Sequence, residues 1–235
     1  MMTHLGASLN HKCLKTSFKN PADPENKVSV LFDACHMLKL VRNTLGAVGV
    51  LIDGDGGKIE WRYITELQKL QEKEGLHLGN KLRASHVKFH SQKMKVKLAA
   101  QTLSSSVAQA IQFCDETLKL PQFRGSAATV RFITMINNLF DVLNSRNPLG
   151  KGFKAPLKRS NRDTWEPLME DAFKYILNLK TLEGVSILET NKKTGFIGFL
   201  ICIRSVWEIF EEYVNKDNAP LLYLLTYKVA FKIFT

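Results

Sequence analysis

The stretch that decides the fold runs from residue 28 to residue 57 and reads VSVLFDACHMLKLVRNTLGAVGVLIDGDGG. Residues 28–32 are β-branched and apolar, which predicts a short buried strand that ends at Asp33. Apolar residues on one helical face follow as far as Leu45, and residues 50–52 predict a second strand before a glycine-rich turn. A sheet made of these two strands, with one helix beside it, cannot have both of its faces buried. We therefore expect this segment to belong to a larger α/β domain.

Beyond residue 60 the hydrophobic periodicity is helical along almost the whole chain. Apolar positions spaced three and four residues apart predict helices over residues 61–75, 98–114, 127–144, 165–179 and 196–214. Residues before position 28 are polar and end in the turn-forming cluster PADPEN, so we expect an irregular lead-in there. The expected fold class is therefore mainly α, with a small α/β segment at the front.

The composition favours a folded, basic protein. The chain has 235 residues and 45% hydrophobic residues, and 33 Lys and Arg against 22 Asp and Glu give a formal net charge of +11. The longest purely apolar run, residues 196–203, is far shorter than the roughly 20 residues of a membrane span. The first residues show no apolar signal region, and the four cysteines form no CxxC pair. We expect a soluble intracellular protein with no membrane partner and no zinc site.

The positive charge is concentrated in two stretches that contain no acidic residue, between Glu74 and Asp115 and between Asp141 and Asp163. The cations of the first stretch are Lys81, Arg83, Lys88, Lys93, Lys95 and Lys97. Those of the second are Arg146, Lys151, Lys154, Lys158, Arg159 and Arg162. Either stretch could follow the phosphate backbone of a nucleic acid, and either could be an ordinary solvated face. An anionic partner is the interpretation that both stretches favour.

Two aspartates are candidates for chemistry. Asp33 ends the first predicted strand, where α/β enzymes hold metal ions, although an aspartate there also caps the next helix. One carboxylate by itself is not a metal site. Asp141 lies near a predicted helix end with Asn144, and an aspartate can accept two hydrogen bonds from guanine, but the pair is also typical of helix capping. No phosphate-binding loop and no Ser-His-Asp arrangement are present in the sequence.

A resemblance to a known family narrows these alternatives. Residues 31–43, LFDACHMLKLVRN, resemble the FDxxHxxKxxRN segment of the P-element-type transposases, the THAP-domain family. Five further blocks follow in the family's order: GLHL at 75–78, KMKVKLAAQTLS at 93–104, FDVLNSR at 140–146, TGFIGF at 194–199 and LLTYK at 224–228. The resemblance implies an RNase H-like catalytic domain that holds metal ions on three carboxylates. It also implies a helical insertion that splits this domain and binds GTP without a phosphate loop.

The resemblance assigns regions and residues. Residues 28–59 correspond to the end of the first RNase H-like half and residues 60–223 to the helical GTP-binding insertion domain. A lead-in of residues 1–27 precedes them and a divergent tail of residues 224–235 follows. Asp33 matches the family's second catalytic aspartate, a metal ligand. The implied guanosine and phosphate contacts are Lys95, Val96, Ser104, Phe140, Asp141 and Asn144, and Lys81 or Lys97 could take the part of Lys95.

The departures from the family decide the expected function. One of the three catalytic carboxylates is present, and a single carboxylate cannot hold two cations about 4 Å apart. We therefore expect neither bound Mg²⁺ nor transposase activity. The expectation is a truncated or domesticated transposase fragment in the nucleus that binds GTP without hydrolysis and contacts DNA through the two basic stretches. Self-association or assembly with a full-length transposase is implied as well. The alternatives are a basic nucleic-acid-binding regulator without nucleotide binding, and a fragment without activity.

Overall fold

The computed structural model describes residues 4–75 and 78–216, which fold into two compact units. Unit 1 comprises the described parts of Met1–Met37, Leu139–Phe173 and Thr194–Thr235. Unit 2 comprises Leu38–Asn138 and Lys174–Lys193, apart from the two undescribed residues. The chain is mainly helical, as expected, and its described residues also form two small antiparallel sheets.

Unit 1 begins with a β-hairpin where an irregular lead-in was expected. Strand β1 (Ser17–Asn20) pairs antiparallel with β2 (Asp23–Ser29), and Phe18 lies opposite Val28. The strand expected over residues 28–32 therefore starts earlier and ends at Ser29. The exposed polar residues of β2 give no alternating apolar pattern, and this explains why the sequence did not indicate it.

Helix α8 (Thr194–Ile209) supplies much of the core of unit 1 and continues into a π-helical segment, η7 (Phe210–Lys216). Ile201 of α8 joins Ala7, Phe18 and Val30 in one buried cluster, so the hairpin packs on this helix. Gly198 permits a close approach to Met37, because a Cβ at this position would lie 1.8 Å from the Met37 Sδ.

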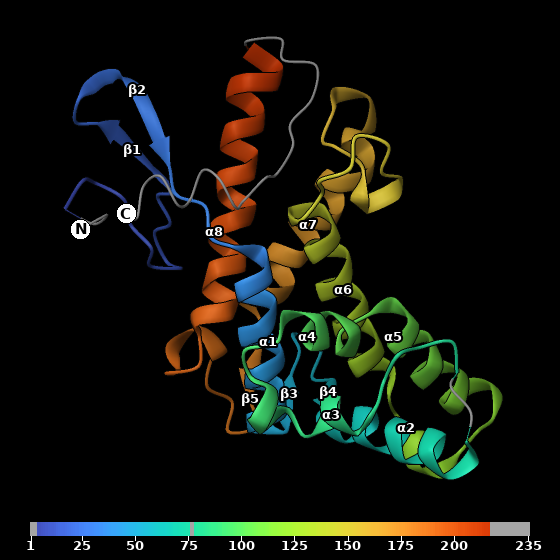
Figure 1. Ribbon diagram of the computed structural model, residues 1–235. Coiled ribbons are helices and arrows are strands. Elements are labelled where there is room, and N and C mark those ends of the chain that lie inside the picture. The colour runs from blue at the N-terminus through green and yellow to red at the C-terminus, as the bar shows by residue number, and fades with distance from the viewer. Residues whose placement is uncertain (1–3, 76–77, 217–235) are drawn as a thin grey trace. The chain divides into compact units, whose positions relative to one another are not determined.

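Unit 2 contains a three-stranded sheet in the order β4-β3-β5 (Figure 1). Strand β3 (Val50–Ile52) pairs antiparallel with β4 (Lys58–Glu60) and with β5 (Lys180–Thr181). The expected glycine-rich turn joins β3 to β4, and the Asp53 carboxylate accepts the Asp55 and Gly57 N–H groups within it. The sequence predicted β3 and the turn but not β4 or β5.

Most helices of unit 2 come from the middle of the sequence. Helix α2 (Trp61–Glu74) ends at Gly75, which has a φ of +66°, as the sequence predicted. The single helix expected over residues 98–114 is instead split at Ser104, whose extended backbone begins a second helix. The segments between Ala84 and Phe123 are α3 (Ala84–Val87), η1 (Phe89–Gln92), α4 (Val96–Thr102), α5 (Ser105–Gln112), the π-helical η2 (Phe113–Thr117) and η3 (Pro121–Phe123).

Three helices contribute residues to both units, because the unit boundaries fall inside them. They are α1 (Ala34–Val48), α6 (Ala127–Leu143) and α7 (Arg162–Leu177). All three were predicted from periodicity to within a few residues. The short 3₁₀ segments η4 (Gly152–Lys154), η5 (Arg159–Asn161) and η6 (Ile187–Glu189) complete the described elements. Within residues 4–75 and 78–216, no helix is long and apolar enough to cross a membrane.

Candidate anion-binding pocket

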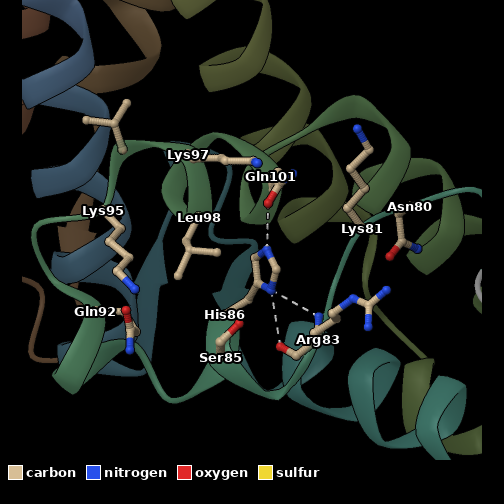
Figure 2. A pocket seen from close by; sticks show the side chains of 11 residues that line it. Asn80, Lys81, Arg83, Ser85, His86, Gln92, Lys95, Lys97, Leu98 and Gln101 are labelled. Atoms are coloured by element: carbon tan, nitrogen blue, oxygen red, sulfur yellow. Dashed lines mark hydrogen bonds between the residues drawn. The ribbon is translucent and has the colours of Figure 1, made fainter.

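Unit 2 holds a pocket of about 750 Å³ between the loop before α3, α3 itself, the end of η1 and the start of α4 (Figure 2). Its volume falls within the range of about 300–1,000 Å³ that small-molecule sites occupy. The lining residues are Asn80, Lys81, Arg83, Ser85, His86, Gln92, Lys95, Val96, Lys97, Leu98 and Gln101. All of these lining residues therefore belong to the first acid-free stretch.

The pocket is strongly cationic. Lys81, Arg83, Lys95 and Lys97 all line it, and no Asp or Glu is among the lining residues. None of these four cations forms an ion pair with another residue that the structure describes. Exposed lysine and arginine side chains without a carboxylate partner suit an anion with several oxygens, above all a polyphosphate.

His86 lies at the centre of the pocket wall and links α3 to α4. Its side chain is buried, and its Nδ1 accepts the Arg83 backbone N–H at 3.0 Å. Its Nε2 lies 3.1 Å from Gln101 Oε1 (Figure 2). This pair of contacts fits a neutral ring with the hydrogen on Nε2. His86 and Arg83 were not singled out as site residues from the sequence, and the only signal for them was their place in the acid-free stretch.

Several residues that the resemblance implied lie in or next to this pocket. Lys95 and Val96 line it, and so do Lys81 and Lys97, the two alternatives to Lys95. Ser104 does not line it, but its hydroxyl donates to the Gln101 carbonyl at 2.9 Å. The roles of these residues in binding nucleotide stay predictions.

The other implied guanosine contacts belong to unit 1. Phe140, Asp141 and Asn144 lie at the C-terminal end of α6 and are half-buried. Lys154 Nζ is 3.7 Å from Asp141 Oδ2, so the carboxylate has a cationic neighbour. Asn144 Oδ1 lies 3.8 Å from the Cys35 Sγ, which donates to it. The part of these three side chains in guanosine binding stays a prediction.

Asp33 caps a helix in this structure. Its Oδ1 accepts the Cys35 N–H at 3.0 Å, and its carbonyl accepts the Met37 N–H at the start of α1. In the described part of the chain, no three His, Cys, Asp or Glu side chains gather into a group that could hold a metal ion. A single capping carboxylate does not fit a two-ion Mg²⁺ centre. The predicted roles of Asp33 in catalysis and metal binding stay predictions.

Two of the sequence blocks that carry the resemblance lie partly or wholly outside the described residues. Leu76 and His77 of the block at residues 75–78 lie outside the described residues. The whole block at residues 224–228 and the tail that follows it lie outside them too.

The second basic stretch differs from the first because much of its charge is already engaged inside unit 1. Arg162 pairs with Glu166 at 2.7 Å and with Glu211 at 2.9 Å. Arg159 donates to the carbonyls of Val214 and Asn215 at the end of the π-helical segment. These cations hold the fold together, so we attribute less anion binding to this stretch than the sequence suggested.

Comparisons with known proteins agree with the resemblance. Residues 35–156 match the family described as "TNP-like, GTP-binding insertion domain", and this match contains the whole pocket. The chain is 32% identical over 228 residues to the human DNA transposase THAP9, a match that covers 97% of this chain and 25% of that protein. It is 33% identical over 147 residues to the Drosophila melanogaster transposable element P transposase, covering 62% of this chain and 18% of that protein.

A solved structure matches as well. The chain superposes on the Drosophila P element transposase strand transfer complex with a TM-score of 0.76 and 26% sequence identity. The match covers 94% of this chain and 47% of the solved chain. The chain thus spans a quarter or less of its curated relatives and about half of the solved chain.

Proposed function

Because this chain belongs to the P-element-type transposase family, we propose that it binds guanine nucleotide and that the pocket of unit 2 takes the polyphosphate. The observation that carries the proposal is the set of four cations, Lys81, Arg83, Lys95 and Lys97, which line one pocket without a carboxylate partner. Phosphate oxygens accept short, charge-assisted hydrogen bonds from such side chains. The position of the pocket inside the match to a GTP-binding domain supports the same conclusion.

We expect binding without hydrolysis. Phosphoryl transfer to water needs a group that orients the water, and carboxylates that hold the metal ions. No carboxylate lines the described pocket, and both ring nitrogens of His86 are engaged in hydrogen bonds. The lining side chains can therefore hold and orient phosphate groups, and none of them is placed to activate a water molecule.

For unit 1, the resemblance assigns the choice of guanine over adenine to Asp141, and this assignment rests on unit 1 alone. A carboxylate can accept hydrogen bonds from the N1–H and the N2 amine of guanine, and adenine offers neither donor in that arrangement. Lys154, 3.7 Å from this carboxylate, compensates its charge when no base is bound. The resemblance also assigns guanosine contacts to Phe140 and Asn144, which lie at the same end of α6 as Asp141.

Calorimetric titration of the full chain with GTP, ATP and inorganic triphosphate tests the proposal. We expect Lys95→Met to weaken GTP and triphosphate binding alike, by about tenfold, because one charge-assisted contact is lost. Asp141→Ala should weaken GTP binding to the level of ATP and leave triphosphate binding unchanged. Lys58→Met, which removes an exposed cation of unit 2 outside the pocket, is the matched control. A folded wild-type chain that shows no saturable GTP binding would refute the proposal.

A second function, contact with the DNA backbone, is favoured by Lys88 and Lys93. Both are exposed, both belong to the first acid-free stretch and neither lines the pocket. They therefore stay available for phosphates outside the nucleotide site, whereas Arg159 and Arg162 of the second stretch are engaged. We propose that the chain acts in the nucleus on DNA, without base-specific readout by these two lysines.

The salt dependence of DNA binding tests this second function. Each phosphate contact contributes about 0.9 to the slope of log affinity against log salt concentration. Lys88→Gln combined with Lys93→Gln should therefore reduce the slope by about 2. Lys19→Gln, an exposed lysine of β1 in unit 1, serves as the control. An unchanged slope in the double variant would show that these lysines do not contact DNA.

A further inference from the structure

Two residues of the FDxxHxxKxxRN block, Arg42 and Asn43, have no part in the function proposed above. Both lie on α1 within unit 2. Arg42 Nη2 donates to the Gln92 carbonyl at 3.0 Å, and Asn43 Nδ2 donates to the Lys93 carbonyl at 3.2 Å. Two consecutive side chains of one helix therefore hold two consecutive carbonyls of the turn that leads into Lys95.

Arg42 is an unusual residue to find in a core. Its side chain is fully buried, and its Nε and Nη1 have no hydrogen-bond partner among the described residues. The guanidinium carbon lies 5.9 Å from the centre of the Phe89 ring, and burial lowers the pKa of Arg42. A buried cation without a carboxylate is costly, and an apolar residue of similar volume is usually tolerated at least as well. The cost indicates a role other than stability.

The same face of α1 is fitted closely to the segment before the turn. Gly46 lies one helical turn after Arg42, and a Cβ at this position would come within 2.5 Å of the Phe89 ring. Phe89 begins η1, the short helix that ends at Gln92. Contacts at positions 42, 43 and 46 thus fix both η1 and the turn that follows it.

The turn carries residues of the pocket. Gln92 and Lys95 both line it, and the Lys95 N–H donates to the Gln92 carbonyl at 3.1 Å, the same carbonyl that Arg42 holds. The Lys95 side chain itself is exposed, so its position depends on how firmly its backbone is held. Holding the backbone before the ligand arrives reduces the entropy lost on binding.

We propose that Arg42 and Asn43 are positioning residues that hold the turn from Gln92 to Lys95 and thereby prepare the pocket for polyphosphate. This proposal rests on the proposed function for the identity of the ligand. Neither residue lines the pocket, so both act through the backbone of the turn. The buried charge of Arg42 also adds to the positive potential behind the pocket wall.

Binding of GTP and of inorganic triphosphate to variants of the full chain provides the first test. Asn43→Ala and Arg42→Met should each raise both dissociation constants by the same factor, about fivefold to tenfold, which corresponds to one lost hydrogen bond. Arg42→Lys keeps the charge and should recover part of the affinity. Asn178→Ala, which removes an Asn-to-carbonyl hydrogen bond elsewhere in unit 2, and Lys58→Met should leave both constants unchanged.

Hydrogen exchange of the backbone amides in residues 88–97, measured without nucleotide, provides a second readout that does not depend on binding. Asn43→Ala should speed exchange in this segment and leave exchange in α6 unchanged. Asn43 is only half-buried, so this variant remains informative if the Arg42 variants fail to fold. Unchanged exchange in the segment would overturn the positioning role whatever the nucleotide result. Faster exchange in a chain whose wild type binds no nucleotide would retain the positioning contact and refute the proposed function.

Discussion

At the scale of single residues, the shape of the pocket wall depends on His86. His86→Leu should remove the hydrogen bonds to the Arg83 N–H and to the Gln101 side chain, each worth about 0.5–1.5 kcal/mol at this partly buried site. His86→Asn keeps an acceptor near the start of α3 and should lose clearly less stability. Urea unfolding of both variants measures the difference, with His36→Leu at an exposed position of α1 as the control. Equal losses in the Leu and Asn variants would contradict the role of His86 as the acceptor of the Arg83 N–H.

Gly198 is a second position at which one contact, with Met37, leaves no room for a side chain. Gly198→Ala should lower the free energy of unfolding by about 1–3 kcal/mol, because the added methyl group meets the buried Met37 Sδ. The higher helix propensity of alanine, worth about 1 kcal/mol, offsets only part of this loss. A double-mutant cycle with Met37→Ala checks the cause. If the cost of Gly198→Ala is the same in both backgrounds, the contact with Met37 is not responsible.

At the scale of elements, the sequence predicts a helix or strand whose hydrophobic pattern lies within the element itself. It does not predict an element that is defined by contacts with residues far away in the chain. Helix α6 and strand β3 were predicted because each carries its own periodicity. Strand β5 was missed because its two residues are defined only by pairing with β3, far away in the chain. The break at Ser104 was missed because the apolar period continues across it into α5.

The sequence likewise predicted some features of the candidate site and not others. The first acid-free stretch identified the lysines of the pocket, because charge is visible in composition. The role of His86 depends on two hydrogen bonds that only the folded chain makes, so no pattern indicated it. For the same reason, the sequence could not show that Arg159 and Arg162 are engaged by carbonyls and carboxylates of a distant segment.

The ion pair between Arg162 and Glu166, one turn apart on α7, has a consequence for the pH dependence of stability. The hydrogen bond from Arg162 lowers the pKa of Glu166. The stabilisation is therefore present above the ordinary glutamate pKa of about 4.3 and is lost as the pH falls through the lowered value. Arg162→Met should lower the free energy of unfolding at pH 7 by less than about 1 kcal/mol, since both side chains are partly exposed. At pH 3 the loss should be smaller, and an equal loss at both pH values in urea unfolding would contradict this assignment.

At the scale of the whole molecule, the thiols report how the two units unfold. Cys13 is exposed, whereas Cys35, Cys114 and Cys202 are buried, and burial raises the pKa of Cys202 to about 12. Because the thiolate is the reactive form, iodoacetamide should modify Cys13 rapidly in the native chain and spare the other three. Increasing urea should then expose Cys114 of unit 2 and Cys202 of unit 1.

We expect Cys114 and Cys202 to become reactive over the same range of urea concentration. Helices α1, α6 and α7 each supply residues to both units. When one unit unfolds, its part of each helix unfolds with it, and this shortens the helices of the other unit. Short labelling pulses followed by peptide mass spectrometry give a midpoint for each thiol, and the far-ultraviolet circular dichroism of the same samples gives the midpoint of the helices. Coincident midpoints would show one cooperative transition. If Cys114 is labelled at a lower urea concentration while Cys202 stays protected, unit 2 opens independently, and binding of inorganic triphosphate to the pocket of unit 2 should then shift the midpoint of Cys114 alone.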